Sequence, residues 1–341
     1  MTMSAFGVMP NATHVHVLRV TAKDCGAGFF ALVVYALNQF IWADMHGYTP
    51  VVEFGERCRD GRVNRYFEAA RGPNVWEYFF EPVSVAKARP SDLQLTVRQL
   101  FALHHTSADS VQTYPHGLYR HLKVPRWRYD EGWHRTMRTR AALTLGRHVR
   151  FRPAPLRAAS MFYRERILAL GAERPVLGLH LRGTDKLRNI GGRIVRPSEY
   201  QPLIDAYLAR RPTAVLFVAT DSPSFLAQLS RQYGERVVQY DALRSERNAF
   251  LDRRIADNYK KGEDALVDAL LLSCTNYLIK PASALSEFAV YLNPELHNHT
   301  YEIQYETGLP DKHAALDRHL GSPRDRARGL SRCAATMRAA G

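Results

Sequence analysis

The residues best suited to chemistry lie together in one stretch, His180-Leu-Arg182-Gly-Thr-Asp-Lys186. It follows a short apolar run, 176–179, that opens after Pro175, and such a run bounded by turn residues is typical of a buried parallel strand. The charged residues would then lie at the carboxyl end of the strand, where open α/β sheets bind ligands. A planar, permanently charged arginine and a lysine suit a phosphate there, although a charged surface turn is the simpler alternative.

Two more loops at predicted strand ends carry polar groups. Thr220-Asp221-Ser222 follows the apolar run 213–219, and Lys280 and Ser283 follow the run 276–280. Each of these loops also opens a predicted helix, whose free backbone amides and dipole favour anions. Because the carboxyl ends of parallel strands meet at one edge of a sheet, the three loops are expected to form one anion-binding site.

Asp268 lies within the largely apolar helical segment 263–273, EDALVDALLLS. A carboxylate in such surroundings is costly unless it has a partner. The paired N–H groups of guanine are one possible partner, because an ionised carboxylate can accept hydrogen bonds from both. A buried basic residue of the protein is an equally good one. The residues alone leave these alternatives open.

The elements expected to position these residues alternate between strand and helix. In the second half of the chain, strands are predicted at 175–181, 213–219, 236–240 and 276–280. Helices are predicted near 197–210, from Pro223 to about 233, at 263–273, and from the Pro281-Ala-Ser-Ala opening to near Asn293-Pro294. This order predicts a doubly wound α/β domain. In the first half, a strand at 14–20, a glycine turn, a helix ending near Gly47 and a strand at 50–54 predict a second α/β unit. A helix at 156–171 is expected to lie between them.

The composition is that of a globular protein, with 46% hydrophobic and 11% aromatic residues in a chain of 341. This length exceeds what one hydrophobic core usually serves, so two domains are expected. The net charge of +14 favours anionic partners: nucleotides, nucleic acid, acidic glycans or a membrane surface. Arginines recur between 120 and 166, where a solvated helical face is the simplest interpretation. The aromatic residues between 60 and 135 are interpreted as core rather than as sugar-stacking groups.

The four cysteines, Cys25, Cys58, Cys274 and Cys333, are widely separated and form no CxxC pair. A zinc site is therefore not expected, Cys274 is interpreted as a small core residue, and a reducing compartment is favoured. The N-terminus lacks the pattern of a signal peptide, and no apolar run reaches the roughly 18 residues of a membrane-spanning helix. We therefore expect a cytoplasmic or membrane-peripheral protein, or a Golgi lumenal one if an anchor has been removed.

Several segments, in order, resemble a known family. DCGAGFF (24–30) is similar to the N-terminal glycine turn of the fucosyltransferases that use GDP-fucose. Three further parts of the chain resemble the three sugar-nucleotide motifs of these enzymes. They are HLRGTDK (180–186), FVATDSP (217–223), and the pair ALVDALLLS (265–273) and KPASALSEFA (280–289). The resemblance is closest to the α1,6-fucosyltransferases, which include the rhizobial nodulation and N-glycan core enzymes, and more distant to the protein O-fucosyltransferases. It covers 14–54 and 174–294.

The resemblance implies a GT-B-like α/β fold with two Rossmann-like domains facing a cleft. An acceptor-side domain would occupy 1–172, a GDP-sugar-binding domain 173–321, and a basic tail 322–341. The implied activity is inverting and metal-independent, without a cofactor, and transfers fucose from GDP-fucose to a hydroxyl of a glycan or protein. The resemblance also implies roles for individual residues. Arg182 would bind the β-phosphate, Lys186 would stabilise the departing diphosphate, and Ser283, beside Ala284, would contact the phosphates. His180 and Asp268 would contact guanine, Asp221, beside Ser222, would contact the nucleotide or its ribose, and Gly26 would help to bind the nucleotide sugar.

The chain departs from the family's pattern in three ways. Gly183 stands where the family has an arginine, and Ser222 stands where it has a second aspartate. The glutamate proposed as the base that deprotonates the acceptor is missing from 187–190. Glu53 and Asp24, predicted near the cleft, are the remaining candidates for that base.

The missing acid keeps other classes of function open. A non-catalytic protein that binds sugar nucleotides or glycans on the same fold is one alternative. A basic nucleic-acid-binding protein is another, favoured by the positive charge, although the arginines are not interleaved with a known nucleic-acid motif. The sequence names neither the acceptor nor the linkage.

Overall fold

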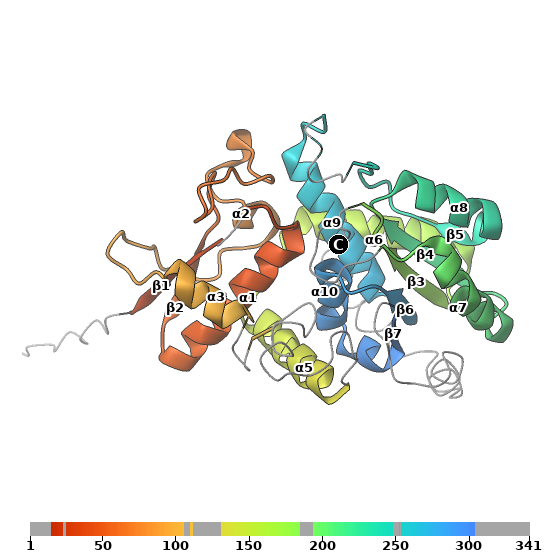
Figure 1. Ribbon diagram of the computed structural model, residues 1–341, viewed down its shortest axis with the longest axis horizontal. Coiled ribbons are helices and arrows are strands. Elements are labelled where there is room, and N and C mark those ends of the chain that lie inside the picture. Colours follow the sequence, from red (N-terminus) through yellow and green to blue (C-terminus); the bar gives the residue numbers. More distant parts are fainter. Residues whose placement is uncertain are drawn as a thin grey trace, which may run out of the picture.

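The computed structural model describes residues 15–22, 25–105, 110–111, 131–184, 194–247, 252 and 254–303. Two parallel sheets lie toward opposite ends of the molecule, and helices fill the space between them (Figure 1). A two-stranded sheet belongs to the N-terminal part and a five-stranded sheet to the C-terminal part. The predicted α/β class with parallel sheets is therefore confirmed.

The N-terminal unit is the β-turn-α-β arrangement that the glycine turn predicted. Strands β1 (Val17–Thr21) and β2 (Thr49–Glu53) pair in parallel, and α1 (Phe29–His46) connects them. The helix ends at Gly47, whose φ of 72° lies in the left-handed region and whose N–H donates to the carbonyl of Ala43. This is the usual glycine stop of a helix, so the predicted end is confirmed.

The region between the two sheets is built from helices and aromatic side chains. It contains α2 (Trp76–Phe79), α3 (Val97–His105), α5 (Glu131–His148) and α6 (Pro153–Phe162), with one 3₁₀ turn at Ala69–Arg71. A π-helical turn at Tyr163–Ile167 and a 3₁₀ turn at Leu168–Leu170 continue α6 to Gly171. Trp76, Phe79 and Phe80 are almost fully buried, so the interpretation of these aromatic residues as core is confirmed.

The C-terminal sheet has the order β5-β4-β3-β6-β7, and all its pairs are parallel. In chain order its elements are β3 (Val176–Leu181), α7 (Pro197–Arg210), β4 (Val215–Thr220), α8 (Pro223–Tyr233), β5 (Val237–Val238), α9 (Asn258–Ser273), β6 (Tyr277–Lys280), α10 (Ala284–Leu292) and β7 (Thr300–Glu302), with 3₁₀ turns at Gly234–Arg236 and Pro294–His299. The chain runs outward from β3 to β5 and then crosses to β6 on the other side of β3. This reversal between β3 and β6 is a topological switch point, the usual place for a ligand.

Helix α9 begins earlier than the sequence predicted. The expected start was residue 263, whereas the helix starts at Asn258, after Asp257. The side chain of Asp257 accepts a hydrogen bond from the backbone N–H of Lys260 at 2.7 Å, which is a standard helix N-cap. The extra turn carries the helix to the N-terminal region, where Gly262 packs so closely on Phe79 that a Cβ would lie 2.5 Å from the ring.

The two faces of the C-terminal sheet bury different helices. Leu177, Leu179 and Leu181 of β3 pack in one cluster with residues of α7, while Val176 belongs to the cluster that contains α9 and α10. Since side chains alternate along a strand, His180 is placed on the same face as Val176. The second cluster extends through α10 to α1, where the rings of Phe30 and Phe288 are 4.6 Å apart. The domain boundary near residue 172 stays a prediction, and the tail at 322–341 lies outside the described residues.

A buried group of charged residues joins α5 to the C-terminal sheet. Arg138 of α5 donates to Glu287 of α10 at 2.6 Å and to Glu302 of β7 at 2.5 Å. Lys280 donates to the same two carboxylates, at 2.7 and 2.9 Å. All four side chains are at most 2% exposed. The interpretation of the arginines as a solvated face is therefore wrong for Arg138, and Lys280 is not a ligand-facing group of its loop.

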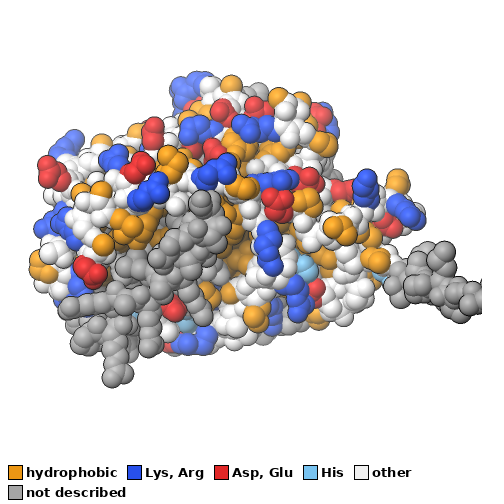
Figure 2. Space-filling model, turned by 180° about the vertical axis from the view of Figure 1, so that it is seen from behind, with side chains coloured by type: hydrophobic (Ala, Val, Ile, Leu, Met, Phe, Trp, Pro, Cys, Tyr) orange, Lys and Arg blue, Asp and Glu red, His pale blue; other side chains and the backbone are white. Residues whose placement is uncertain are grey.

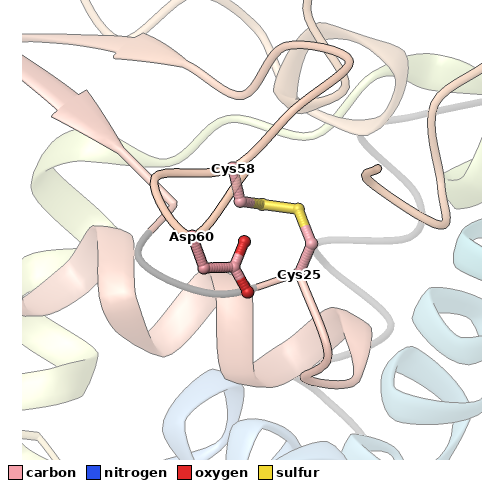
Figure 3. A group of neighbouring side chains, drawn as sticks. All are labelled: Cys25, Cys58 and Asp60. Carbon is pink, nitrogen blue, oxygen red and sulfur yellow. A yellow bond between two sulfur atoms is a disulfide. The ribbon is translucent and has the colours of Figure 1, made fainter. Parts of the chain in front are cut away.

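Cys25 and Cys58 form a disulfide, which the sequence analysis did not anticipate. Figure 3 shows it joining the turn before α1 to the loop after β2, with the carboxylate of Asp60 beside it. Cys274 is buried as expected but is also disulfide-bonded. The expectation of reduced cysteines is therefore wrong for these residues. Disulfides persist mainly in oxidising compartments, and the compartment of the protein stays a prediction. Separately, no helix in the described part of the chain combines the length and apolar character needed to cross a membrane.

Removing the Cys25–Cys58 disulfide is expected to lower the free energy of unfolding by about 3–4 kcal/mol, since the bridge closes a loop over a sequence separation of 33 residues. The comparison is urea unfolding of the wild type and the Cys25→Ser/Cys58→Ser variant, both without reductant so that Cys274 stays bonded. Equal unfolding midpoints at equal slopes would contradict the expected stabilisation.

Candidate functional site

The loop after β3 is held by Asp221, which follows β4. One carboxylate oxygen of Asp221 accepts from the backbone N–H of Gly183 at 2.8 Å, and the other accepts from the hydroxyl of Thr184 at 2.7 Å. Nε of Arg182 lies 3.9 Å from that second oxygen. Asp221 therefore orients the backbone and the arginine of the loop, and its predicted contact with a nucleotide stays a prediction.

Gly183 and Ser222, two residues that differ from the pattern that the sequence motifs resemble, lie against each other. A Cβ on Gly183 would be 2.8 Å from Cβ of Ser222 and 3.0 Å from the ring of Phe225, so no side chain fits there without movement. Ser222 is fully buried and caps α8 by accepting from the backbone N–H of Phe225 at 3.3 Å. A glycine in one loop and a small residue in the other allow the β3 and β4 loops to pack closely.

The start of α8 is filled by a carboxylate of the protein itself. Glu246 accepts from the backbone N–H of Ser224 at 2.7 Å and from the hydroxyl of Ser222 at 3.1 Å. Burial alone would raise the pKa of Glu246, but the hydrogen bonds from Ser224 and Ser222 outweigh burial and lower it. Glu246 therefore occupies the position at this helix start where a ligand anion was predicted, and the predicted contacts of Asp221 and Ser222 with a nucleotide stay predictions.

The start of α10 is different. Ser283 precedes the first helical residue, Ala284, and its side chain makes no capping hydrogen bond. Ser283 is 2% exposed, and its buried Oγ has no hydrogen-bond partner among the described residues. A helix start with uncapped amides and a buried, unpaired hydroxyl suits an anion supplied by a ligand. It lies directly after β6, at the switch point of the sheet.

Asp268 is the second group with an unused hydrogen-bonding atom. It lies on the inner face of α9, is 5% exposed, and its buried Oδ1 has no partner in the described part of the chain. Burial raises the pKa of Asp268 to about 8; Arg244 and Lys260 lower it and Asp264 raises it further. Since no base in the described part of the chain forms an ion pair with this carboxylate, the structure favours the first of the two sequence alternatives, a ligand with N–H donors.

His180 and Arg182 complete this edge of the sheet. His180 is 4% exposed, and its carbonyl accepts from the hydroxyl of Tyr200 at 2.7 Å, which fixes the end of β3 against α7. The imidazole is on the sheet face covered by α9, the helix that carries Asp268. The predicted residues His180, Arg182, Asp268 and Ser283 thus belong to β3, α9 and the β6–α10 turn, which surround one switch point.

The segment 240–247 connects these elements, and it was not predicted as part of the site, because its sequence is polar and irregular. The backbone N–H of Leu243 donates to Asp264 of α9 at 2.8 Å, and that of Ser245 donates to the carbonyl of Asp221 at 3.0 Å. Glu246 closes the start of α8. The segment therefore spans from α9 to the β4 loop, and two of its residues that were not predicted, Arg244 and Glu246, lie beside predicted site residues: Arg244 beside Asp268 and Glu246 beside Ser222.

The remaining predicted residues are less constrained. Lys186 and Asp24 lie outside the described residues. Gly26 lies in the turn before α1, next to the disulfide-bonded Cys25. Glu53 ends β2 and forms an ion pair with Arg19 at 2.8 Å, so its availability as a base stays a prediction.

One group among the described residues has ligand atoms spaced like those of a metal site. It consists of Cys25, Cys58 and Asp60 (Figure 3). Its two sulfur atoms are bonded to each other, so neither is a thiolate that binds zinc. On the face shown in Figure 2, lysine and arginine side chains are interspersed with acidic ones and form no continuous basic stripe there.

No known protein family and no curated protein matches the chain. Two solved structures of the fucosyltransferase NodZ from Bradyrhizobium are similar to it. The first has 15% sequence identity and a TM-score of 0.45, and the similarity covers 81% of this chain and 92% of that one. The second, of the selenomethionine protein, has 14% identity and a TM-score of 0.43 over the same shares.

Proposed function

We propose that the protein is a glycosyltransferase that uses a GDP-sugar, with GDP-fucose as donor and a hydroxyl of a glycan or protein as acceptor. The observation that supports it best is the pair of buried atoms that have no partner among the described residues: Oγ of Ser283, directly after β6, and Oδ1 of Asp268, on the helix α9 that packs on the same sheet. A carboxylate can accept from the N1–H and N2–H groups of guanine. An uncapped helix start and Arg182 suit the diphosphate attached to the same nucleotide.

The reaction would proceed by one displacement with inversion. The acceptor oxygen attacks the anomeric carbon of the sugar while the bond from that carbon to the β-phosphate oxygen breaks. Negative charge then develops on GDP, and the amides at Ser283 together with Arg182, oriented by Asp221, would stabilise it. Lys186 is expected to assist. The hydroxyl proton would pass to a base, for which Glu53 and Asp24 remain the candidates.

We propose that this chemistry needs no metal ion. Both carboxylate oxygens of Asp221, the acid next to Arg182, already accept from Gly183 and Thr184. The groups placed to neutralise the leaving diphosphate are a guanidinium and backbone amides, which supply positive charge directly.

Thermal unfolding with GDP, GDP-fucose, UDP and ADP, each with and without a chelator, tests the proposal. GDP and GDP-fucose are expected to stabilise the protein by about 2.7 kcal/mol at a hundred times their dissociation constant, with no effect of the chelator. Arg182→Ala should abolish sugar transfer, and the exposed Arg157→Ala variant, with the same change of charge, should not. Stabilisation by UDP, or only with metal, would refute the donor class. GDP binding without transfer to any acceptor would favour the non-catalytic binding protein.

A further inference from the structure

Arg244 of the segment 240–247 carries an unused donor close to the unused acceptor of Asp268. Nε of Arg244 is buried and has no hydrogen-bond partner in the described structure. Oδ1 of Asp268 is likewise buried and without a partner there. The backbone N–H of Leu243, the residue before Arg244, donates at 2.8 Å to Asp264, which lies one helical turn before Asp268 on α9. Burial raises the pKa of Asp268, and the charge of Arg244 lowers it in part. A permanently charged guanidinium and a titratable carboxyl group are therefore neighbours.

The guanidinium of Arg244 is held in place by the backbone of its own segment. Nη1 donates to the carbonyl of Ala242 at 3.0 Å and Nη2 donates to that of Tyr240 at 2.6 Å. These bonds occupy the outer nitrogens and leave Nε–H for another acceptor. The segment is in turn anchored to Asp264 and to Asp221, so the position of the donor is fixed from both sides.

Arg244 and Asp268 do not satisfy each other. Within the described residues, Asp268 forms no ion pair, and the hydrogen bonds of Arg244 go to carbonyls. Burying a charged donor and a charged acceptor unpaired is costly, and a direct ion pair would relieve both. A ligand that offers an acceptor to one group and donors to the other relieves both equally well.

We propose that Arg244 contacts the base of the nucleotide and makes binding specific for guanine. Its Nε–H donates to O6 of guanine, while Asp268 accepts from N1–H and N2–H. The inference rests on the proposed GDP-sugar donor and adds a specificity-determining residue to it. Guanine presents an acceptor at position 6 and donors at positions 1 and 2, which match Arg244 and Asp268 respectively. Adenine presents a donor at position 6 and an acceptor at position 1, so it places a donor against Arg244 and an acceptor against Asp268.

Calorimetric binding of GDP, 6-thio-GDP and IDP to the whole chain separates the two contacts. The 6-thio compound replaces O6 by a weaker acceptor, whereas IDP keeps O6 and lacks the 2-amino group. The wild type is expected to prefer GDP to either analogue by about tenfold, the size of one base contact. Arg244→Met should weaken GDP binding by about 10- to 100-fold and erase the preference over 6-thio-GDP, while the preference over IDP persists.

Arg247→Met is the matched control, because Arg247 is exposed, lies in the same segment and carries the same charge. It should leave both preferences unchanged. A purely structural Arg244 would weaken all three nucleotides alike, and an unchanged ratio of GDP to 6-thio-GDP in the variant would overturn the inference. If Arg244→Met fails to fold, a wild type that does not distinguish GDP from 6-thio-GDP overturns it equally. A wild type that binds no guanine nucleotide refutes the proposed function instead.

Discussion

Replacing Asp268 by asparagine is expected to change the preferred nucleotide from GDP to xanthosine diphosphate. The carboxylate accepts from both N1–H and N2–H of guanine, whereas an amide offers one acceptor and one donor. The amide matches xanthine, which keeps N1–H but has a carbonyl oxygen at position 2. GDP affinity should fall by about 100- to 1000-fold, because a buried donor of the base then faces a donor. Calorimetric titration of the wild type and the variant with GDP and with xanthosine diphosphate measures this change of preference.

Asp264→Asn is the control for this variant. Asp264 is also a buried acid of α9, but its oxygens accept from Lys260 at 2.7 Å and from Leu243 at 2.8 Å. It is therefore occupied by the protein, and its replacement should not favour xanthosine diphosphate. A variant Asp268→Asn that folds and still prefers GDP would show that Asp268 does not contact the base.

The same contact makes GDP binding depend on pH. Asp268 must be ionised to accept from guanine, and burial raises its pKa in the free protein to about 8. GDP affinity should therefore rise with pH below about 8 and level off above it. Besides burial, the charges of Arg244, Lys260 and Asp264 determine the pKa of Asp268, and so the pH at which GDP affinity levels off. Asp268→Asn should remove this dependence on pH.

The sequence predicted four of the five strands of the C-terminal sheet, because each of the four contains an apolar run, but it did not predict β7, whose three residues Thr300–Glu302 form no such run. The helix 197–210 was placed correctly by its Pro197-Ser198-Glu199 start. The start of α9 was missed because its cap, Asp257, lies in a polar stretch without periodicity. Local pattern thus identifies elements reliably where the pattern is strong.

Pairings between distant parts of the chain could not be predicted in the same way. Arg138 and Glu287 are 149 positions apart, and nothing near either residue indicates the other. The same holds for Ser222 and Glu246, which together close the start of α8. For the candidate site, the sequence indicated which residues are unusual for their surroundings, such as Asp268. Only the fold shows which of them the protein satisfies itself and which it leaves to a ligand.

Removing Arg138 is expected to cause the largest loss of stability of any single change at the buried charged group. Arg138 and Lys280 balance Glu287 and Glu302, so the group is neutral as a whole. Burial alone would raise the pKa of Glu287, but the charges of Arg138 and Lys280 outweigh burial and lower it. Arg138→Met leaves two buried carboxylates with only Lys280 to balance their charge, and should lower the free energy of unfolding by about 3–5 kcal/mol.

A second variant separates lost charge balance from lost packing. In Arg138→Met/Glu302→Gln, the remaining pair of Lys280 and Glu287, 2.7 Å apart, is neutral again. The double variant should therefore be more stable than Arg138→Met alone, although it contains one more change. Arg135→Met, which loses an exposed pair with Glu131 and an exposed hydrogen bond to Asn298 at 3.3 Å, should change stability by less than about 1 kcal/mol. Urea unfolding measures all three, and a double variant less stable than the single one would mean that packing, not charge, holds α5 to α10.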